Sequence, residues 1–456
     1  MAHDRAMRRL AEALQLGFII ALTLSAQLLC CGCIKWLGLH SSGQLTSADT
    51  GSRFCRIQLR SEVLNRRQAK FCRKSGHATV SAVIRAAQLT IASCESQFRN
   101  FRWNCQVLKS VPDLAPELRS LTAEQALVHA LSGLALATTL STECSRGLSP
   151  SCGCGSRPDW AVARKPEMQF KFEGCHANLR AGQRLARRFL SAGAGAFKRR
   201  RRRRPRQGRR RRRQRNRPNP AKKSSGLVQT YDQFAKMVNA FNYRVGIRAA
   251  KHSEAVQCKC HGQSASCTVR TCHRILYRRN QQLLASAYIR RSDVDPLDLL
   301  LELYDRKLRR TVFDETGYQG YEEPCSEADR LPNPLRGQPT CEAFKVVPGL
   351  PKENALLFHE HSLDYCSTRE GRFPGTVGRE CLPDGSPEAV QLIRSGSGER
   401  RREILCSVMC CGRTHATANY TYPGNHPECQ HKTCRLLSNP FRVVCTDCHL
   451  KKSICN

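Results

Sequence analysis

The sequence predicts an α+β, disulfide-rich fold. We expect a helical N-terminal domain that carries a disulfide-stapled loop, followed by a cysteine-rich C-terminal domain of β-hairpins. Apolar residues recur at helical spacing through the first two thirds of the chain, and this periodicity ends near Gly317. The 456 residues include 27 cysteines. So many cysteines behind an apolar N-terminal segment favour an oxidising, extracytoplasmic compartment.

The N-terminal residues have the pattern of a secretory leader. Arg5, Arg8 and Arg9 precede an uncharged, largely apolar run from Leu16 to Ile34. A basic segment followed by an apolar one predicts a signal peptide over residues 1–34. At 19 residues, the run is also long enough to span a bilayer, so an uncleaved signal anchor remains the alternative.

Apolar stripes and capping residues predict four main helices in the N-terminal domain. Thr122 and Gln125 form a capping-box signal before Leu127, Leu131 and Leu134. A further helix is expected from Leu227 to Ala249. The other two stripes contain Val80, Ile84, Ala87, Ile91, Cys94 and Phe98, and, after Pro296 in a first turn, Leu297, Leu300, Leu301, Tyr304 and Leu308. We expect all of them to form core.

Composition divides the remaining chain into domains. The helical domain is expected over residues 55–197 and 224–316. Between these parts, residues 198–223 carry seventeen Lys or Arg and no acid, which predicts a disordered insertion because like charges repel. Residues 317–363 are predicted to be a linker. Cysteines crowd residues 364–456, so bridges rather than hydrophobic burial are expected to stabilise that domain.

The basic insertion supplies much of the net charge of +38. In a nuclear protein such a run would indicate nucleic acid, which we do not expect here. In a disulfide-rich secreted chain the expected polyanion is a sulfated glycosaminoglycan, and a solvated linker without a partner is the alternative. Its dibasic runs are also sites for convertases. The candidate polyanion-binding residues are Arg199, Arg200, Arg201, Arg202, Arg203, Arg204, Arg209, Arg210, Arg211, Arg212 and Arg213.

The most informative segment runs from Cys258 to Cys272. A bridge between Cys260 and Cys267 would close a loop of six residues, and a bridge between the two outer cysteines would lock its base. The enclosed residues are small or flexible and offer the hydroxyl of Ser264. Zinc binding by the four cysteines is an alternative that their spacing and the oxidising compartment disfavour. Since no carboxylate lies nearby to complete a triad, the loop suits a modifying enzyme's acceptor better than a catalyst.

This segment resembles the signature of the Wnt family of secreted signalling proteins, Cys-Lys-Cys-His-Gly-x-Ser-Gly-Ser-Cys. Further resemblances lie at Glu95–Arg99, Arg102–Cys105, Asp364–Cys366, Gly375–Arg379, Cys381 and Cys410–Arg413, in the order of the family. Together they cover roughly residues 55 to 456. The segments Thr268–Thr271 and Gly371–Cys381 look nearest to the subgroup numbered nine.

The resemblance implies a ligand whose loop at 258–272 is a lipidated thumb and whose C-terminal domain is a knot-like finger. The family's serine that matches Ser264 carries palmitoleate, added by a membrane-bound acyltransferase, and we expect no other cofactor and no metal. A secretion carrier, the cysteine-rich domain of a Frizzled receptor, an LDL-receptor-related coreceptor and heparan sulfate proteoglycan are the implied or expected partners. The chain is expected in the extracellular space and matrix, and on membranes through its lipid.

Two groups of residues are the candidate receptor contacts. The thumb group is His261, Gly262, Gln263, Ser264, Ala265 and Ser266, and the finger group is Leu436, Leu437 and Phe441. For the finger group, simple packing within a hairpin is an equal alternative. Asn419 begins an N-glycosylation sequon, whose occupancy would mark an exposed loop.

The resemblance also implies a set of disulfides. The pairs are Cys94–Cys105, Cys144–Cys152, Cys154–Cys175, Cys258–Cys272, Cys260–Cys267, Cys366–Cys411, Cys381–Cys406, Cys410–Cys455 and Cys429–Cys448. Cys55–Cys72 and Cys325–Cys341 are suggested by proximity in sequence. Cys434 and Cys445 are paired because they remain.

Three departures from the family's pattern keep other functions open. Ala265 stands where the family has glycine, His273 stands where it has tryptophan, and the finger lacks the family's vicinal cysteine pair and tryptophan. The alternative function is therefore a heparan-sulfate-binding extracellular protein of the same fold with reduced or unconventional receptor activation. An extracellular enzyme is not expected, because the sequence offers no paired carboxylates, HExxH motif or nucleophile elbow.

Overall fold

The computed structural model divides into two compact units. Unit 1 comprises Met1–Thr90 and Ser110–Ser362, and unit 2 comprises Ile91–Lys109 and Leu363–Asn456. Within them the structure describes residues 34–43, 52–111, 116–147, 149–156, 175–193, 231–260, 270–276, 287–290, 295–313, 319–325, 343–368, 375–394, 403–424, 429, 434–438 and 441–456. The basic insertion and residues 1–33 of the expected leader lie outside these ranges.

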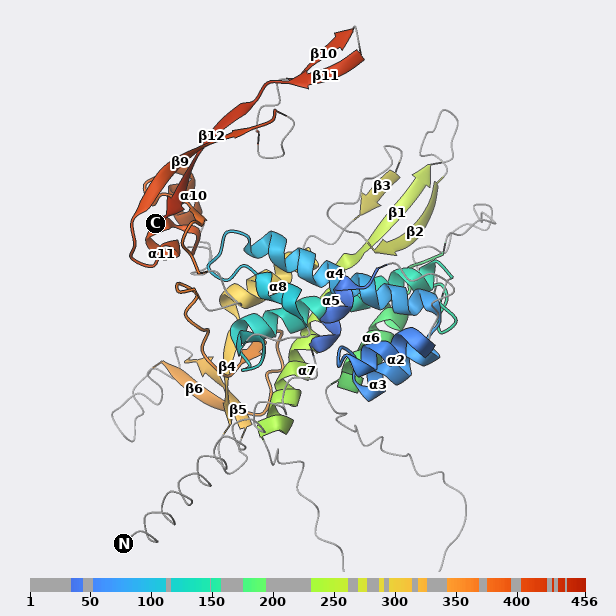
Figure 1. Ribbon diagram of the computed structural model, residues 1–456. Helices are drawn as coiled ribbons and strands as arrows, with labels where there is room; N and C mark the ends of the chain where they lie inside the picture. The colour runs from blue at the N-terminus through green and yellow to red at the C-terminus, as the bar shows by residue number, and fades with distance from the viewer. Residues whose placement is uncertain are drawn as a thin grey trace, which may run out of the picture. The chain divides into compact units, whose positions relative to one another are not determined.

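Unit 1 is mainly helical (Figure 1). Its helices are η1 (Lys35–Ser41), α2 (Ser52–Arg60), α3 (Arg66–Lys74), α4 (His77–Phe98, whose last turns belong to unit 2), η4 (Pro116–Leu118), α5 (Ala123–Ser145), α6 (Leu179–Gly193), α7 (Tyr231–Ala249), η7 (Ala250–Ser253) and α8 (Pro296–Arg306). The four predicted helices are therefore present as α4, α5, α7 and α8. The expected start of α7, residues 227–230, lies outside the described part.

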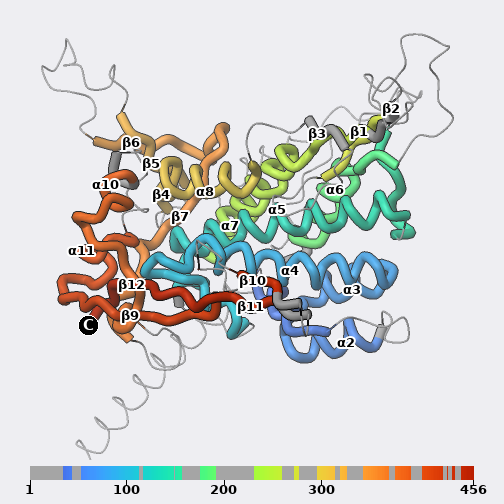
Figure 2. The backbone as a smooth tube through the Cα atoms, turned by 90° about the horizontal axis from the view of Figure 1, so that it is seen from above, coloured from blue at the N-terminus to red at the C-terminus, as the bar shows by residue number. Residues whose placement is uncertain are grey.

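Helix α5 is the centre of unit 1, and α6, α7 and α8 pack on it (Figure 2). It is buried along almost its whole length. It begins as its capping residues predict, since the Thr122 hydroxyl accepts a hydrogen bond from the backbone N–H of Gln125 at 3.3 Å. The Gln125 side chain in turn accepts from the N–H of Leu121 at 2.7 Å, one residue earlier than in the usual capping box.

Glycines allow α7 to approach α5 at backbone distance. A Cβ atom on Gly246 of α7 would lie 1.8 Å from the carbonyl oxygen of Ala130, which real Cβ atoms do not do. A Cβ atom on Gly133 of α5 would lie 2.5 Å from the carbonyl oxygen of Tyr243. Side chains at either position would force the two helices apart, so the helix propensity lost at these glycines is compensated by contact area.

The fold of unit 1 begins before residue 55, where the sequence placed its start. Trp36 is fully buried in η1, and Ile34, assigned above to the leader, is 2% exposed. The Trp36 ring packs edge-on against Phe189 of α6, with ring centroids 5.4 Å apart. The ring of Phe71 of α3 also packs against Phe189, with centroids 5.5 Å apart. This aromatic cluster joins η1, α3 and α6. Because Ile34 is buried directly before η1, it belongs to the fold of unit 1.

The expectation of a linker over residues 317–363 is wrong for its described part. Strands β4 (Leu308–Phe313), β5 (Gln319–Pro324), β6 (Phe344–Pro348) and β7 (Leu356–Phe358) form a sheet in the order β6-β5-β4-β7, with β7 parallel to β4. Leu308 begins β4, so it is not part of the helical face to which it was assigned; α8 ends at Arg306. The β-branched and aromatic run Thr311–Phe313 favours a strand, and β7 extends this sheet within unit 1.

Unit 2 contains short helices as well as the expected hairpins. Strands β8 (Glu380–Cys381), β12 (Cys448–Cys455) and β9 (His415–Tyr422) form one antiparallel sheet, and β10 (Cys434–Ser438) pairs with β11 (Phe441–Cys445). The helices are α10 (Pro387–Arg394) and α11 (Cys406–Met409), with η3 (Gln106–Ser110) at the end of its first segment. Its small core contains Cys406, Met409, Cys410 and Cys455.

A half-buried arginine, Arg379, joins the two sequence segments of unit 2. The guanidinium of Arg379 donates hydrogen bonds to the carbonyl oxygens of Arg99, Phe101 and Arg102 at 2.8, 2.6 and 2.8 Å. Burial lowers the pKa of this guanidinium. Because three carbonyls satisfy its donors, Arg379 stabilises the Phe98–Cys105 turn against the motif that begins at Gly375.

Ten disulfides have both cysteines in the described residues. They are Cys55–Cys72, Cys94–Cys105, Cys144–Cys152, Cys154–Cys175, Cys258–Cys272, Cys366–Cys411, Cys381–Cys406, Cys410–Cys455, Cys429–Cys448 and Cys434–Cys445. Every pair named above whose two side chains are described is among them. Cys325 is also disulfide-bonded, while Cys267 and Cys341 lie outside the described residues.

Within the described part of the chain, no helix combines the length and the apolar character that a membrane span requires.

Candidate functional site

The thumb loop rises from the central strand of a small sheet. Strands β1 (Glu254–Cys260), β2 (Arg270–Leu276) and β3 (Ala287–Arg290) form this sheet in the order β2-β1-β3. Helix α7 leads through η7 directly into β1, so the strand that feeds the loop continues a helix packed on the core. The sheet projects from the helices of unit 1 (Figure 1).

A disulfide closes the base of the loop. Cys258 of β1 lies directly opposite Cys272 of β2, and their Sγ atoms are bonded, with the Cα atoms 4.0 Å apart. Two residues further along, Cys260 is opposite Arg270. The register and the bridge therefore fix the two ends of residues 261–269 beside each other.

The foot of the hairpin is attached to the segment that follows Cys175. The backbone N–H of Arg274 donates to Nδ1 of His176 at 3.0 Å, and its carbonyl accepts from the N–H of Ala177 at 2.8 Å. Cys175 is itself bridged to Cys154. Two hydrogen bonds and a nearby bridge thus hold β2 in place, and a stable base limits the entropy that the loop loses when it binds.

The tip of the thumb lies outside the described residues. This range contains all six thumb residues proposed as receptor contacts, including Ser264 and Ala265, and also Cys267. His273, which replaces the family's tryptophan, is half-buried on β2 opposite Gln257. Burial lowers the pKa of this imidazole and so favours its neutral form.

The finger hairpin exposes apolar side chains. Leu436 of β10 is 69% exposed, and Val443, directly opposite on β11, is 65% exposed. The bridge Cys434–Cys445 closes the base of this hairpin. The side chains of Leu437 and Phe441 are not among those described. The sequence analysis did not include Val443 among the candidate contacts. It could have been found from the hairpin pairing, because Val443 lies two residues after the start of β11 and directly opposite Leu436 of β10.

Asn419 of the sequon is exposed on β9, the edge strand next to β12. The sequence had placed it in a loop, and the structure places it in the middle of a strand. A glycan attached there would project from an accessible sheet edge.

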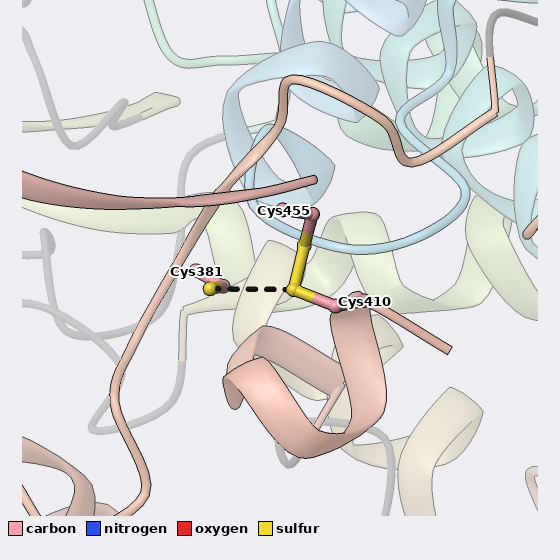
Figure 3. A group of neighbouring side chains, drawn as sticks. All are labelled: Cys381, Cys410 and Cys455. Atoms are coloured by element: carbon pink, nitrogen blue, oxygen red, sulfur yellow. Dashed lines mark hydrogen bonds between the residues drawn. A yellow bond between two sulfur atoms is a disulfide. The ribbon is translucent and has the colours of Figure 1, made fainter. Parts of the chain in front are cut away.

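Three cysteine sulfur atoms lie as close together as the ligands of a metal ion, but none of them is a free thiol. Cys381, Cys410 and Cys455 lie together in unit 2, with Sγ of Cys381 3.6 Å from Sγ of Cys410 (Figure 3). Cys410 is bonded to Cys455, and Cys381 is bonded to Cys406. Metal binding requires thiolates, and these sulfurs are all in disulfides, so the cluster is structural.

Comparison with known proteins gives a consistent result. The wnt family model matches residues 60–456. The chain is 31% identical to protein Wnt-11b-1 of Xenopus tropicalis over 422 residues, which are 92% of each chain. It is 27% identical to protein Wnt-11 of Coturnix japonica over 402 residues, 87% of this chain and 88% of the relative.

Two solved structures have a weaker likeness. Human WLS in complex with WNT8A matches with a TM-score of 0.41 and 21% identity, over 83% of this chain and 93% of that chain. The Drosophila WntD N-terminal domain-linker matches with a TM-score of 0.32 and 15% identity, over 63% and 98%. Both scores are too low to carry an argument.

The relatives from Xenopus tropicalis and Coturnix japonica are both Wnt-11 proteins. They therefore do not support the expected likeness to the subgroup numbered nine. The match to the family model and the coverage of Wnt-11b-1 agree with the motifs, the disulfides and the α+β architecture. The chain belongs to the Wnt family.

Proposed function

We propose that this Wnt-type secreted signalling ligand is acylated on Ser264 and binds the cysteine-rich domain of a Frizzled receptor through its thumb. The observation that carries the proposal is the stapled hairpin at Cys258 and Cys272, which presents the serine-containing segment from a well-anchored sheet. Such a base suits a loop that must enter an acyltransferase and later a receptor groove without rearranging. Ligands of this family are signalling proteins, and we assign no catalytic role.

The lipid supplies what the polar loop lacks. The residues of the tip can bury little apolar area, whereas each buried CH2 of an acyl chain contributes about 0.8 kcal/mol. A palmitoleoyl chain in a receptor groove would then contribute on the order of 10 kcal/mol before entropic losses. The same chain makes the free protein depend on a membrane or a secretion carrier and keeps it membrane-associated after release.

The finger hairpin is the second proposed receptor contact. Leu436 and Val443 form an apolar pair on one face, and Leu437 and Phe441 complete the candidate group. Two separate contacts on one receptor domain raise affinity through effective concentration. Engagement of an LDL-receptor-related coreceptor by the receptor-bound ligand would then give the signal. A glycan on Asn419 is proposed on the exposed edge strand.

A second candidate function has its own support. Ala265 replaces a glycine in the thumb, and the insertion contains the runs Arg199–Arg204 and Arg209–Arg213. If the added methyl group prevents acylation, the chain becomes a heparan-sulfate-binding protein of the same fold with altered receptor activation. The two candidates differ in whether the secreted protein carries a lipid.

Metabolic labelling with an alkyne fatty acid distinguishes them. The wild type is compared with Ser264→Ala and with Ser266→Ala, which removes a hydroxyl from the same loop. We expect label on the wild type and on Ser266→Ala, and none on Ser264→Ala. Correctly secreted wild type without label would refute acylation and favour the second candidate. Label that persists on Ser264→Ala would refute the assigned residue.

A further inference from the structure

Two disulfides of unit 2 are in direct contact. The bridge Cys381–Cys406 joins β8 to the start of α11. The bridge Cys410–Cys455 joins the residue that caps the end of the same helix to β12. The Sγ atoms of Cys381 and Cys410 are 3.6 Å apart, and both lie within 4.8 Å of Sγ of Cys455 (Figure 3). We call these four cysteines the paired-bridge cluster.

The four cysteines differ in their access to solvent. Cys381 is half-buried on β8, an edge strand of its sheet. Cys406, Cys410 and Cys455 are each at most 2% exposed. Exchange between a thiol and a disulfide requires that a thiolate reach one of the two bonded sulfurs. An external thiol therefore enters the cluster at Cys381, and the bridge to Cys406 is the first of the two to open.

The second bridge lies within reach of the sulfur that this reaction frees. In the native pairing, Sγ of Cys381 lies beside the Cys410–Cys455 bond and not on its axis, because it is also close to Sγ of Cys455. Attack on a disulfide requires an approach along that axis, so the two intact bridges do not exchange. Once Cys406 has released it, the Cys381 side chain is free to rotate about its Cα–Cβ bond. Its sulfur then has to close a gap of 3.6 Å to a bond of about 2.0 Å.

Backbone contacts hold the cysteines together while a bridge is open. The carbonyl of Leu382, next to Cys381, accepts from the N–H of Cys406 at 2.9 Å and keeps β8 beside α11. The N–H of Cys455 donates to the carbonyl of Arg379 at 3.0 Å, and β12 is paired with β9 along its whole length. None of these bonds involves a sulfur atom. A freed thiolate therefore stays beside its neighbour at a high effective concentration.

We propose that the paired-bridge cluster is a site of thiol–disulfide exchange, which a protein dithiol enters at Cys381. The dithiol reduces the bridge Cys381–Cys406 to two thiols and is itself oxidised to a disulfide. The Cys381 thiolate then attacks Sγ of Cys410, forms the bridge Cys381–Cys410 and releases the Cys455 thiolate. The proton that Cys381 lost is regained by Cys455, so this second step is an exchange with no net change of redox state.

The exchange gives unit 2 a route to rearrange its bridges without unfolding. It leaves Cys406 and Cys455 as thiols on α11 and β12. If the disulfide form of the same partner oxidises this pair, its dithiol is regenerated and the pairing has been isomerised. The reverse sequence restores the native bridges. The partner is therefore a thiol–disulfide oxidoreductase of an oxidising compartment, and the inference is independent of acylation and of receptor binding.

Two single substitutions, one in each bridge, test the exchange without a reductant. Cys406→Ala leaves Cys381 as a thiol. We expect it to form Cys381–Cys410 and to leave the free thiol on Cys455. Cys455→Ala leaves Cys410 as a thiol, and we expect the same new bridge with the free thiol on Cys406. The two variants thus begin from different free thiols and converge on one bridge.

The matched control is Cys429→Ala. Its partner Cys448 belongs to no group of close sulfurs in the described part of the chain, so the free thiol should stay on Cys448. Full-length secreted protein is alkylated, digested without reduction and mapped by mass spectrometry, and circular dichroism establishes that each variant folds. We expect the new bridge in about a tenth of the molecules or more, a difference of about 1.4 kcal/mol or less between the two pairings.

Several outcomes would overturn the proposal. One is a free thiol confined to Cys381 in Cys406→Ala and to Cys410 in Cys455→Ala. Another is equal rearrangement in the control, which would mean general scrambling. The wild type with a limiting dithiol provides a test that needs no variant to fold. There Cys381–Cys410 should appear while the rest of unit 2 is intact, and opening of Cys410–Cys455 before Cys381–Cys406 would refute entry at Cys381.

Discussion

Replacing His129 by glutamine is expected to remove a pH dependence that is built into the core of unit 1. His129 lies in the second turn of α5 with no exposed surface, and burial lowers the pKa of its imidazole from 6.5 to about 3. Its Nε2 atom lies 3.3 Å from the amide nitrogen of Gln125. That amide's oxygen already accepts from Leu121, so the nitrogen faces the ring as a donor.

The hydrogen bonding fixes the neutral ring and explains why it resists protonation. Nε2 of His129 accepts from Gln125, so the proton is on Nδ1, which has no hydrogen-bond partner among the described residues. A second proton would place an N–H group against the amide donor. The ring also packs edge-on against Tyr243, with centroids 4.4 Å apart, and gains no compensating charge there.

The magnitude follows from linkage. Because the folded-state pKa is below the unfolded value, the stabilisation is complete above about pH 6.5 and is lost as the pH falls toward 3. At about 1.4 kcal/mol per pKa unit, unit 1 should lose about 2 kcal/mol between pH 7 and pH 5. Gln in place of His129 does not titrate and keeps an acceptor for Gln125, so the variant should lack this loss.

Urea unfolding followed by far-ultraviolet circular dichroism measures the effect, with disulfides intact. The wild-type midpoint should fall between pH 7 and pH 5 by roughly 1 M more than that of His129→Gln, for an m-value of about 2 kcal/mol/M. The variant has lower stability at pH 7 because the ring contact is lost, so only the change with pH is diagnostic. Equal falls in the two proteins would refute the assignment of the pH dependence to His129.

Three further substitutions test the fold and the finger. Gly246→Ala should destabilise unit 1 by about 3 kcal/mol, because the new Cβ atom collides with a carbonyl oxygen of α5. Thermal unfolding measures this effect. The control, Gly153→Ala, should show no comparable loss of stability, because its Cβ atom would contact nothing within 4 Å. Arg379→Lys should destabilise unit 2 by about 2 kcal/mol, measured as faster proteolysis of the 91–109 segment. The single ammonium nitrogen of lysine cannot replace the two nitrogens of the planar guanidinium, which together reach the three carbonyls. Leu436→Ser should weaken binding to a Frizzled cysteine-rich domain about 10-fold without changing stability, because it removes an exposed apolar side chain from the proposed contact. Val444→Ser is the control, since Val444 is also exposed but lies opposite Arg435, on the other face of the hairpin.

The sequence predicted α4, α5, α7 and α8 because each has a local signal, whereas α2, α3 and α6 were not predicted. The apolar stripe of α4, the cap at Thr122 and the proline that begins α8 all act within one or two turns. The error at Leu308 has a physical cause, since that residue continues the helical spacing but follows the last turn of α8. What makes it a strand residue is its pairing with Leu356 of β7, which lies further along the chain.

The strands found within the expected linker show a second limit of prediction from the sequence. Strand β6 alternates between exposed and half-buried residues, which is a strand signal, but only five residues carry it and a proline ends it. Strand β7 has three residues and pairs in parallel, so no local pattern announces it. The close contact between Gly133 and α7 is equally invisible, because glycine in a helical stripe usually indicates a break.

The thumb and the contact between α3 and α6 differ in how much of each could be predicted from the sequence. The thumb could be proposed from fifteen consecutive residues, since a hairpin's register brings Cys258 and Cys272 together without help from the rest of the chain. The contact between α3 and α6, in contrast, joins helices whose exposed cations, such as Arg67 and Arg184, are more than a hundred positions apart in the sequence. Phe71 and Phe189 bring these helices into contact, and Trp36 packs on the same cluster. Such a contact appears only once the aromatic core that joins α3 to α6 is known, so a charge count could locate the arginine run in the sequence but could not show that these two helices are neighbours.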